Sequence, residues 1–192
     1  MQNRTSSPEW NALAETALAQ AGLFTATQAA MAGYSAQLLA HHARVGRFER
    51  LRRGIYRITY FPAGEHDDLI LAWLWTGREG VVSHQTALAL GNLSDVLPSE
   101  IHLTLPVSWR RRRLRVPDGI RLHFGDVEST DRTWVGAVPV TTTARTLEDC
   151  AADNLAPNLL LQAAEQALHR GLITRDEIPT VIATLRDFGG LP

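Results

Sequence analysis

The stretch "RFERLRRGIYRI", residues 47–58, predicts a β-hairpin and so limits the folds that this chain can adopt. Arg53-Gly54 can form a two-residue loop, because glycine supplies the positive φ that such loops favour. A hairpin through this loop pairs Arg52 with Ile55, Leu51 with Tyr56, and Arg50 with Arg57. Side chains alternate between the faces of a strand, so this register predicts an apolar face with Leu51 and Tyr56. The opposite face carries Arg50, Arg52 and Arg57.

The expected Arg50–Arg57 pair suggests a function for this hairpin. Like charges directly opposite on a sheet destabilise it. Phosphate groups lying against them would offset that cost and release counterions. We therefore predict that the hairpin contacts nucleic acid. A surface hairpin with its arginines in water remains the alternative.

Three short helices are expected before the hairpin. Ser7, Ser35 and a Thr25–Gln28 capping box supply the N-terminal caps. The predicted helices cover residues 8–20, 26–32 and 36–45. Three helices followed by a basic hairpin predict a winged helix-turn-helix.

The third helix offers candidate base-reading side chains. Gln37, His41 and Arg44 stand at helical spacing and should share its outward face. Gln and Arg can form paired hydrogen bonds with base edges in the major groove. His42 is expected to pack rather than to bind a ligand. The predicted DNA-binding residues are Gln37, His41, Arg44, Arg47, Arg50, Arg52, Arg53 and Arg57.

The rest of the chain alternates between strand and helix patterns. Residues 60–65 contain Pro and Gly and predict a linker, which gives domains at 1–59 and 66–192. An apolar helix is expected at 66–75. Strands are expected near 81–82, 100–107 and 119–127, with helices near 84–90, 157–170 and 175–186. Residues 136–152 are expected to form a strand that leads into a helix capped by Thr142 or Thr143. The predicted fold class is α+β, with a winged helix-turn-helix followed by a mixed α/β domain.

A second basic run, "WRRRRLR", lies between two of the expected strands. It comprises Arg110, Arg111, Arg112, Arg113 and Arg115. The run could contact DNA beside the wing, receive an acidic partner protein, or be a solvated loop. Together the two basic patches lie within a chain whose formal net charge is only -1.

The sequence gives little support for a catalytic, metal-binding or cofactor-binding site. The seven histidines are scattered, and no metal-binding, nucleophile-elbow or phosphate-loop motif occurs. Ser83 is expected to cap a helix rather than to act with His84, and Cys150 to be a buried, inert thiol. We therefore expect no catalytic residue, no metal and no cofactor. No segment resembles a membrane span or a signal peptide, and a cytoplasmic location is expected.

Three segments resemble the AbiEi-type antitoxin family. They are "GLFTATQAAMAGYSAQLL…GRFERLRRGIYRI" (22–58), "VVSHQTALALGNLSDVLPSEIHLTLP" (81–106) and "VPVTTTARTLEDCA" (138–151). The resemblance implies the antitoxin of a type IV toxin–antitoxin system that binds double-stranded DNA at its own promoter. It also implies that the chain counters a nucleotidyltransferase-like toxin, directly or indirectly. In this chain Ala36-Gln37 stand where the family's recognition helices often begin with arginines.

Other functions remain as alternatives. They are a stand-alone winged-helix regulator, a non-enzymatic protein-interaction module, and a degenerate nuclease or nucleotidyltransferase-like enzyme. The resembling "TTTARTLED" stretch has a structural interpretation, in which Thr142 or Thr143 caps a helix and Arg145 pairs with Asp149 at i+4.

Overall fold

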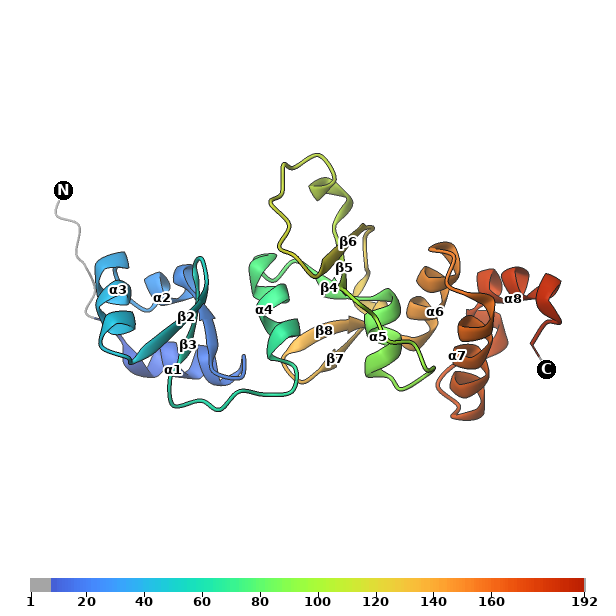
Figure 1. Ribbon diagram of the computed structural model, residues 1–192, viewed down its shortest axis with the longest axis horizontal. Coiled ribbons are helices and arrows are strands. Elements are labelled where there is room, and N and C mark those ends of the chain that lie inside the picture. The colour runs from blue at the N-terminus through green and yellow to red at the C-terminus, as the bar shows by residue number, and fades with distance from the viewer. Residues whose placement is uncertain (1–7, 192) are drawn as a thin grey trace. The chain divides into compact units, whose positions relative to one another are not determined.

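The computed structural model describes residues 8–191 and divides into two compact units, 1–78 and 79–192. The Ser7 cap expected for the first helix lies outside the described residues. Each unit has its own sheet and its own helices (Figure 1). The fold is α+β, with a winged helix-turn-helix at the N-terminal end, as the sequence predicts.

The first unit consists of helices packed on a three-stranded antiparallel sheet of order β1-β3-β2. Its core contains Leu13 of α1, Phe24 of β1, Leu39 of α3 and Phe48 of β2. The elements are α1 (Trp10–Leu18), β1 (Leu23–Thr25), α2 (Ala26–Met31), α3 (Ala36–Arg44), β2 (Phe48–Arg52), β3 (Ile55–Ile58) and α4 (Asp67–Trp75).

Two predicted caps of this unit are confirmed. The hydroxyl of Thr25 accepts a hydrogen bond from the Gln28 backbone N–H, and the Gln28 side chain accepts one from the Thr25 N–H. Ser35 caps α3 by accepting from the Leu38 N–H at 3.2 Å. These caps fix where α2 and α3 begin, and so fix the helix-turn-helix.

The expected position of α4 needs correction. The sequence places this apolar helix in the second domain, whereas its contacts with β1 and β3 place it in the first unit. Leu23 and Ile55 are buried and share the sheet face that carries Arg57. Because α4 packs on these strands, that face of the wing sheet is not open to solvent.

The second unit has a mixed five-stranded sheet of order β6-β5-β4-β8-β7. β5 and β6 run parallel, as do β4 and β8, while the other neighbours are antiparallel. The strands are β4 (Val81–Val82), β5 (Ile101–Leu105), β6 (Ile120–Phe124), β7 (Arg132–Val135) and β8 (Val138–Thr141). The loop that joins the parallel strands β5 and β6 projects from the sheet (Figure 1).

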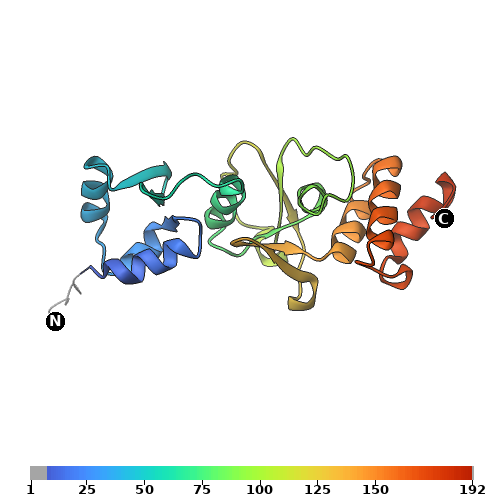
Figure 2. The ribbon, with the colours of Figure 1, turned by 90° about the horizontal axis from the view of Figure 1, so that it is seen from below.

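Helices form the rest of the second unit and bury its main apolar cluster. Leu88, Leu147 and Leu160 have no exposed surface, and α6, α7 and α8 lie side by side in both ribbon views (Figure 2). The helices are α5 (His84–Leu90), α6 (Thr143–Ala152), α7 (Pro157–His169) and α8 (Pro179–Leu185). Single 3-10 turns occur at 107–109, 129–131, 175–177 and 186–188. A Thr174–Glu177 capping box caps the third of these turns, so the last α-helix begins at Pro179 and not at the expected residue 175.

Candidate nucleic-acid interface and histidine cluster

Helix α3 has the two faces that the sequence predicts. Leu39 is buried in the core of the first unit, whereas Gln37, His41 and Arg44 are exposed. Since residues at i, i+4 and i+7 lie in one row along a helix, these three side chains form one polar stripe. The stripe starts in the first turn after the Ser35 cap.

His42 packs inside the unit rather than facing outward. Its ring centroid lies 5.1 Å from that of Phe48 and 5.8 Å from that of Tyr34. Burial, followed by the nearby Arg47 charge, lowers the pKa of His42 below its ordinary value. The predicted packing role agrees with this geometry.

The register of the wing differs from the expected one. Arg52 pairs with Ile55 across the Arg53-Gly54 turn, as predicted, and Gly54 has a φ of 77°. A bulge between Arg50 and Arg52 then shifts the pairing by one residue. The expected pair of Arg50 with Arg57 is therefore wrong, and no like charges face each other at this point of the wing.

The residue that lies opposite Arg57 is Glu49, an opposite charge. Arg50 instead lies opposite Tyr56, and the Tyr56 ring stacks on Phe24 with centroids 5.8 Å apart. A bulge adds one residue to one strand, so it turns the following side chains to the other face. The bulge at Leu51 thus separates Arg50 from Arg57.

Arg57 has a partner within the unit. Its guanidinium forms an ion pair with Asp67, the first residue of α4, and only 12% of the Arg57 side chain is exposed. The same Asp67 oxygen accepts a hydrogen bond from the Gly64 N–H at 2.9 Å. Arg57 therefore ties the wing to α4, and we remove it from the surface proposed below.

The remaining cations of this region lie around α3 and the tip of the wing. Arg47, Arg50 and Arg53 are exposed, and Arg52 is partly buried. The carbonyl of Gly54 accepts a hydrogen bond from the Ala26 N–H at 2.8 Å, which holds the wing tip against the start of α2. We call the following set the α3–wing surface: Gln37, His41, Arg44, Arg47, Arg50 and Arg53.

The second basic run forms the loop between β5 and β6. Its five arginines are exposed, and the Arg112 guanidinium lies 4.1 Å from the centroid of the Trp109 ring. Arg110 lines a cavity in the second unit. The loop thus combines an internal cation–π contact with a cation at a cavity wall.

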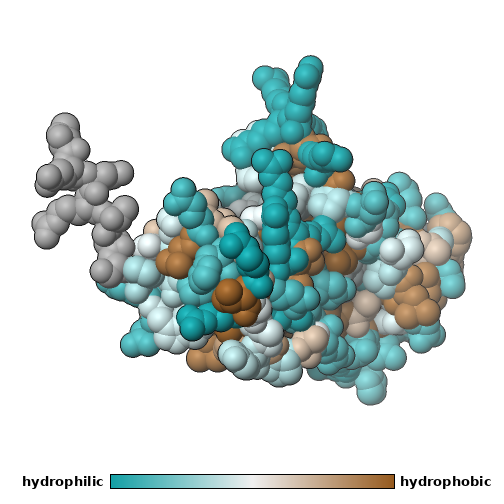
Figure 3. All heavy atoms as spheres, turned by 60° about the vertical axis from the view of Figure 1, so that its left-hand side comes forward, coloured by the Kyte–Doolittle hydropathy of each residue, from teal (hydrophilic) through white to brown (hydrophobic). Residues whose placement is uncertain are grey.

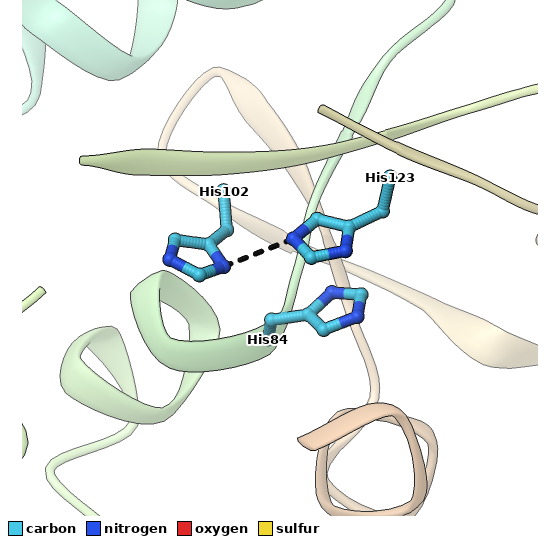
Figure 4. A group of neighbouring side chains, drawn as sticks. All are labelled: His84, His102 and His123. Atoms are coloured by element: carbon cyan, nitrogen blue, oxygen red, sulfur yellow. Dashed lines mark hydrogen bonds between the residues drawn. The ribbon is translucent and has the colours of Figure 1, made fainter. Parts of the chain in front are cut away.

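Three histidines that lie far apart in the sequence meet beside this cavity, and two of them, His84 and His123, line it. His84 begins α5, His102 lies on β5 and His123 lies on β6 (Figure 4). His123 Nε2 is 3.0 Å from His102 Nδ1, and the His84 and His123 rings stack with centroids 3.5 Å apart. One ring nitrogen from each residue can be chosen so that all three lie within 4.8 Å of one another.

Burial disfavours the charged form of these imidazoles. It lowers the pKa of His84 and of His123 to about 4, and it also lowers the pKa of His102. The His84 and His123 rings are therefore neutral at pH 7. The cavity that His84 and His123 line has a volume of about 510 Å³, and its charged lining residues are Arg110, Arg145, Asp149 and Asp153.

Ser83 occupies the cap position of α5, but its side chain does not cap the helix. Its Oγ lies 2.9 Å from His84 Nδ1 and 2.8 Å from Thr104 Oγ1. The capping role predicted for the Ser83 side chain is therefore wrong. The hydroxyl instead orients the His84 ring, and His84 has an unusual φ of 52°.

The predicted Arg145–Asp149 ion pair is confirmed. Arg145 Nε donates to Asp149 Oδ1 at 2.8 Å, and its Nη1 donates to Asp131 Oδ2 at 3.0 Å. Asp149 Oδ2 is buried and accepts no hydrogen bond from the protein. Thr142 stands at the cap position of α6 without a side-chain cap bond. Cys150 is buried, as predicted, and burial raises the pKa of its thiol.

Sequence reasoning missed the histidine cluster because its members are far apart in the chain. Only the parallel pairing of β5 with β6 brings His102 near His123. The alternation of side chains along β5 could have indicated part of the cluster, since it places His102 and Thr104 on one face of that strand. No local motif connects either strand to His84.

On the face shown in Figure 3, hydrophobic side chains occur in small separate groups among hydrophilic ones. Among the described residues, no helix is long and apolar enough to cross a membrane.

Comparison with known proteins supports the assignment of the first unit. Residues 11–59 match the profile of a family described as "Transcriptional regulator, AbiEi antitoxin". The match covers α1 to β3 and confirms the predicted resemblance there. A comparison with curated proteins finds no match. Among solved structures, the chain is similar to the RV2827C protein from Mycobacterium tuberculosis, with 16% identity, a TM-score of 0.41, and coverage of 95% of this chain and 84% of that one.

Proposed function

We propose that this protein is a DNA-binding transcriptional regulator of its own promoter, and that it acts as the antitoxin of a type IV toxin–antitoxin system. The family match over residues 11–59 supports the regulatory role. The observation that carries the DNA-binding part is the polar stripe of α3, with Gln37, His41 and Arg44 exposed on one face. Catalysis forms no part of this proposal.

The α3–wing surface provides two kinds of contact. Gln37 and Arg44 can form paired hydrogen bonds with adenine and guanine edges when α3 enters the major groove. Arg47, Arg50 and Arg53 can neutralise phosphates, which fixes position and gives affinity without reading sequence. The stripe therefore selects the site, and the arginines at its end and on the wing hold the duplex.

Binding to the chain's own upstream DNA tests this proposal. The assay is fluorescence anisotropy with a duplex from upstream of the gene and a shuffled duplex of equal length and composition. We expect the upstream duplex to bind roughly 100-fold or more tightly, in the range that separates specific from non-specific binding. Gln37→Ala should reduce this preference, whereas Arg50→Ala should weaken both complexes alike. Equal affinity for both duplexes would contradict promoter recognition.

The antitoxin role rests on the family resemblance and has its own test. A nucleotidyltransferase-like protein encoded next to this gene would be expressed alone and together with the full chain. We expect growth arrest from the first and growth in the second, with or without a stable complex between the two proteins. If promoter binding is found and growth is not restored, the chain is a stand-alone regulator.

The exposed arginines of the β5–β6 loop offer a second surface, for DNA or for an acidic partner. A variant with Arg111, Arg113 and Arg115 changed to Ala distinguishes these roles in the same two assays. Weaker DNA binding would extend the interface to this loop. Loss of growth rescue with unchanged DNA binding would assign the loop to a protein partner.

A further inference from the structure

We propose that His84, His102 and His123 form a binding site for a divalent transition-metal ion, with Zn²⁺ as the best-suited metal and one coordination position open to the adjoining cavity. Three imidazole nitrogens in one place are a ligand set that zinc, cobalt and nickel favour over magnesium or calcium. The site lies wholly in the second unit and is independent of the DNA-binding proposal.

The spacing of the nitrogens fits such an ion. A tetrahedral site with metal–nitrogen bonds of about 2.05 Å places its ligand atoms roughly 3.3 Å apart. His123 Nε2 and His102 Nδ1 are 3.0 Å apart, and one nitrogen of His84 joins them within 4.8 Å. Binding requires the His84 ring to leave its stack on His123 so that its lone pair points at the ion. The two ring planes are now only 15° apart, so metal binding includes a rotation of the His84 ring about its side-chain bonds.

The hydrogen bonding of the cluster also fits. Neutral imidazole is the form that binds metal. His102 Nδ1 and His123 Nε2 share one hydrogen bond in the metal-free arrangement. Each ring can hold its single proton on the other nitrogen, so a metal replaces this hydrogen bond without removing a proton from the cluster.

Neighbouring groups orient the ligands as metal sites require. Ser83 Oγ lies 2.9 Å from His84 Nδ1 and can accept a hydrogen bond from an Nδ1–H group, and in that tautomer His84 Nε2 is the ligand atom. Thr104 Oγ1 in turn lies 2.8 Å from Ser83 Oγ. A hydrogen bond of this kind fixes the tautomer and the direction of a metal-binding histidine.

The cavity supplies the open position and compensating charge. His84 and His123 line it together with Asp149 and Asp153, while Arg145 on the same wall is paired with carboxylates. Asp149 Oδ2 is buried without a hydrogen bond from the protein. An acceptor in that state suits a water molecule bound to the metal, because such a water donates hydrogen bonds strongly.

The test is metal binding by the full chain after treatment with a chelator. Zn²⁺ is titrated by calorimetry, and Co²⁺ by absorption, since tetrahedral Co²⁺ has intense visible bands that octahedral Co²⁺ lacks. We expect one equivalent per chain and a tetrahedral spectrum. His84→Gln, His102→Gln and His123→Gln should each weaken binding roughly 100-fold or more, beyond the effect of losing a second-shell partner.

His169→Gln is the matched control, because His169 is exposed on α7 in the same unit. It should bind metal like the unchanged chain. Should a triad variant fail to fold by circular dichroism, the unchanged chain still decides the question. Absence of stoichiometric binding there, or binding that survives in folded triad variants, would overturn the proposal and leave the cluster as a neutral structural stack.

Discussion

The ion pair between Arg57 and Asp67 gives the sharpest mutational test of the wing. Asp67→Ala removes the carboxylate that pairs with Arg57 and also accepts from the Gly64 N–H. The side chains are only 12% and 17% exposed, so the remaining guanidinium would stay largely desolvated. Exposed pairs contribute up to about 1 kcal/mol, and breaking a buried pair costs about 3–5 kcal/mol. Since the burial of this pair is intermediate, we expect Asp67→Ala to lower the free energy of unfolding of the first unit by about 2 kcal/mol.

Hydrogen exchange of peptides from residues 9–78 in a urea series measures this loss for the first unit alone. Asp68→Ala is the control, because Asp68 lies in the same first turn of α4 but is exposed. The double variant Arg57→Met with Asp67→Leu should recover stability to within about 1 kcal/mol of the unchanged chain, since it leaves no unpaired charge.

The same variants separate stability from DNA binding. The double variant should bind DNA with an unchanged salt dependence, because Arg57 serves the contact with α4 and not the phosphates. Our account of the wing would be refuted if Asp67→Ala cost no more than Asp68→Ala. It would also be refuted if the double variant lost the salt dependence of DNA binding.

Three further predictions concern single positions. Cys150 should not react with a thiol reagent at pH 8 until urea unfolds the second unit, because burial raises its pKa and excludes the reagent. Gly22→Ala should destabilise the first unit by about 2 kcal/mol or more in a urea titration, since its φ is 84° and a Cβ there would overlap Phe61. Gly46→Ala, with a φ of 75° and open space around it, should cost only about 1 kcal/mol, and equal costs would contradict the overlap. Gln28→Ala should lower the free energy of unfolding of the first unit by about 2 kcal/mol in the same titration, because it removes a capping bond and the buried hydrogen bond to Gln20. An unchanged free energy of unfolding would contradict this prediction.

Local chemistry made much of the fold predictable. The Thr25–Gln28 box and the Ser35 cap located the two helices of the helix-turn-helix, because capping depends on residues only three apart. Helical spacing likewise gave the outward face of α3. The Arg145–Asp149 pair followed from its i, i+4 positions on one helix.

Tertiary packing accounts for what the sequence did not show. The alternation of residues in the sequence does not reveal the bulge at Leu51. The expected register is therefore correct for Arg52 and Ile55 but off by one residue for Arg50 and Glu49. The apolar run at 67–75 shows that α4 is buried, but not which sheet it covers. Strand β1 is three residues long, and only its pairing with β3 identifies it. The histidine cluster depends on the parallel pairing of β5 and β6, which no local pattern in the sequence specifies.

The salt dependence of DNA binding measures whether the α3–wing surface holds the duplex. The chain with Arg47, Arg50 and Arg53 changed to Ala is compared with a control in which three exposed arginines of the second unit, Arg170, Arg175 and Arg186, are changed to Ala. Each phosphate that a protein neutralises adds roughly 0.9 to the slope of log affinity against log salt concentration. Our account predicts that the first variant loses about 2–3 from that slope and that the control keeps the slope of the unchanged chain. Equal slopes in the two variants would show that the α3–wing surface does not hold the duplex.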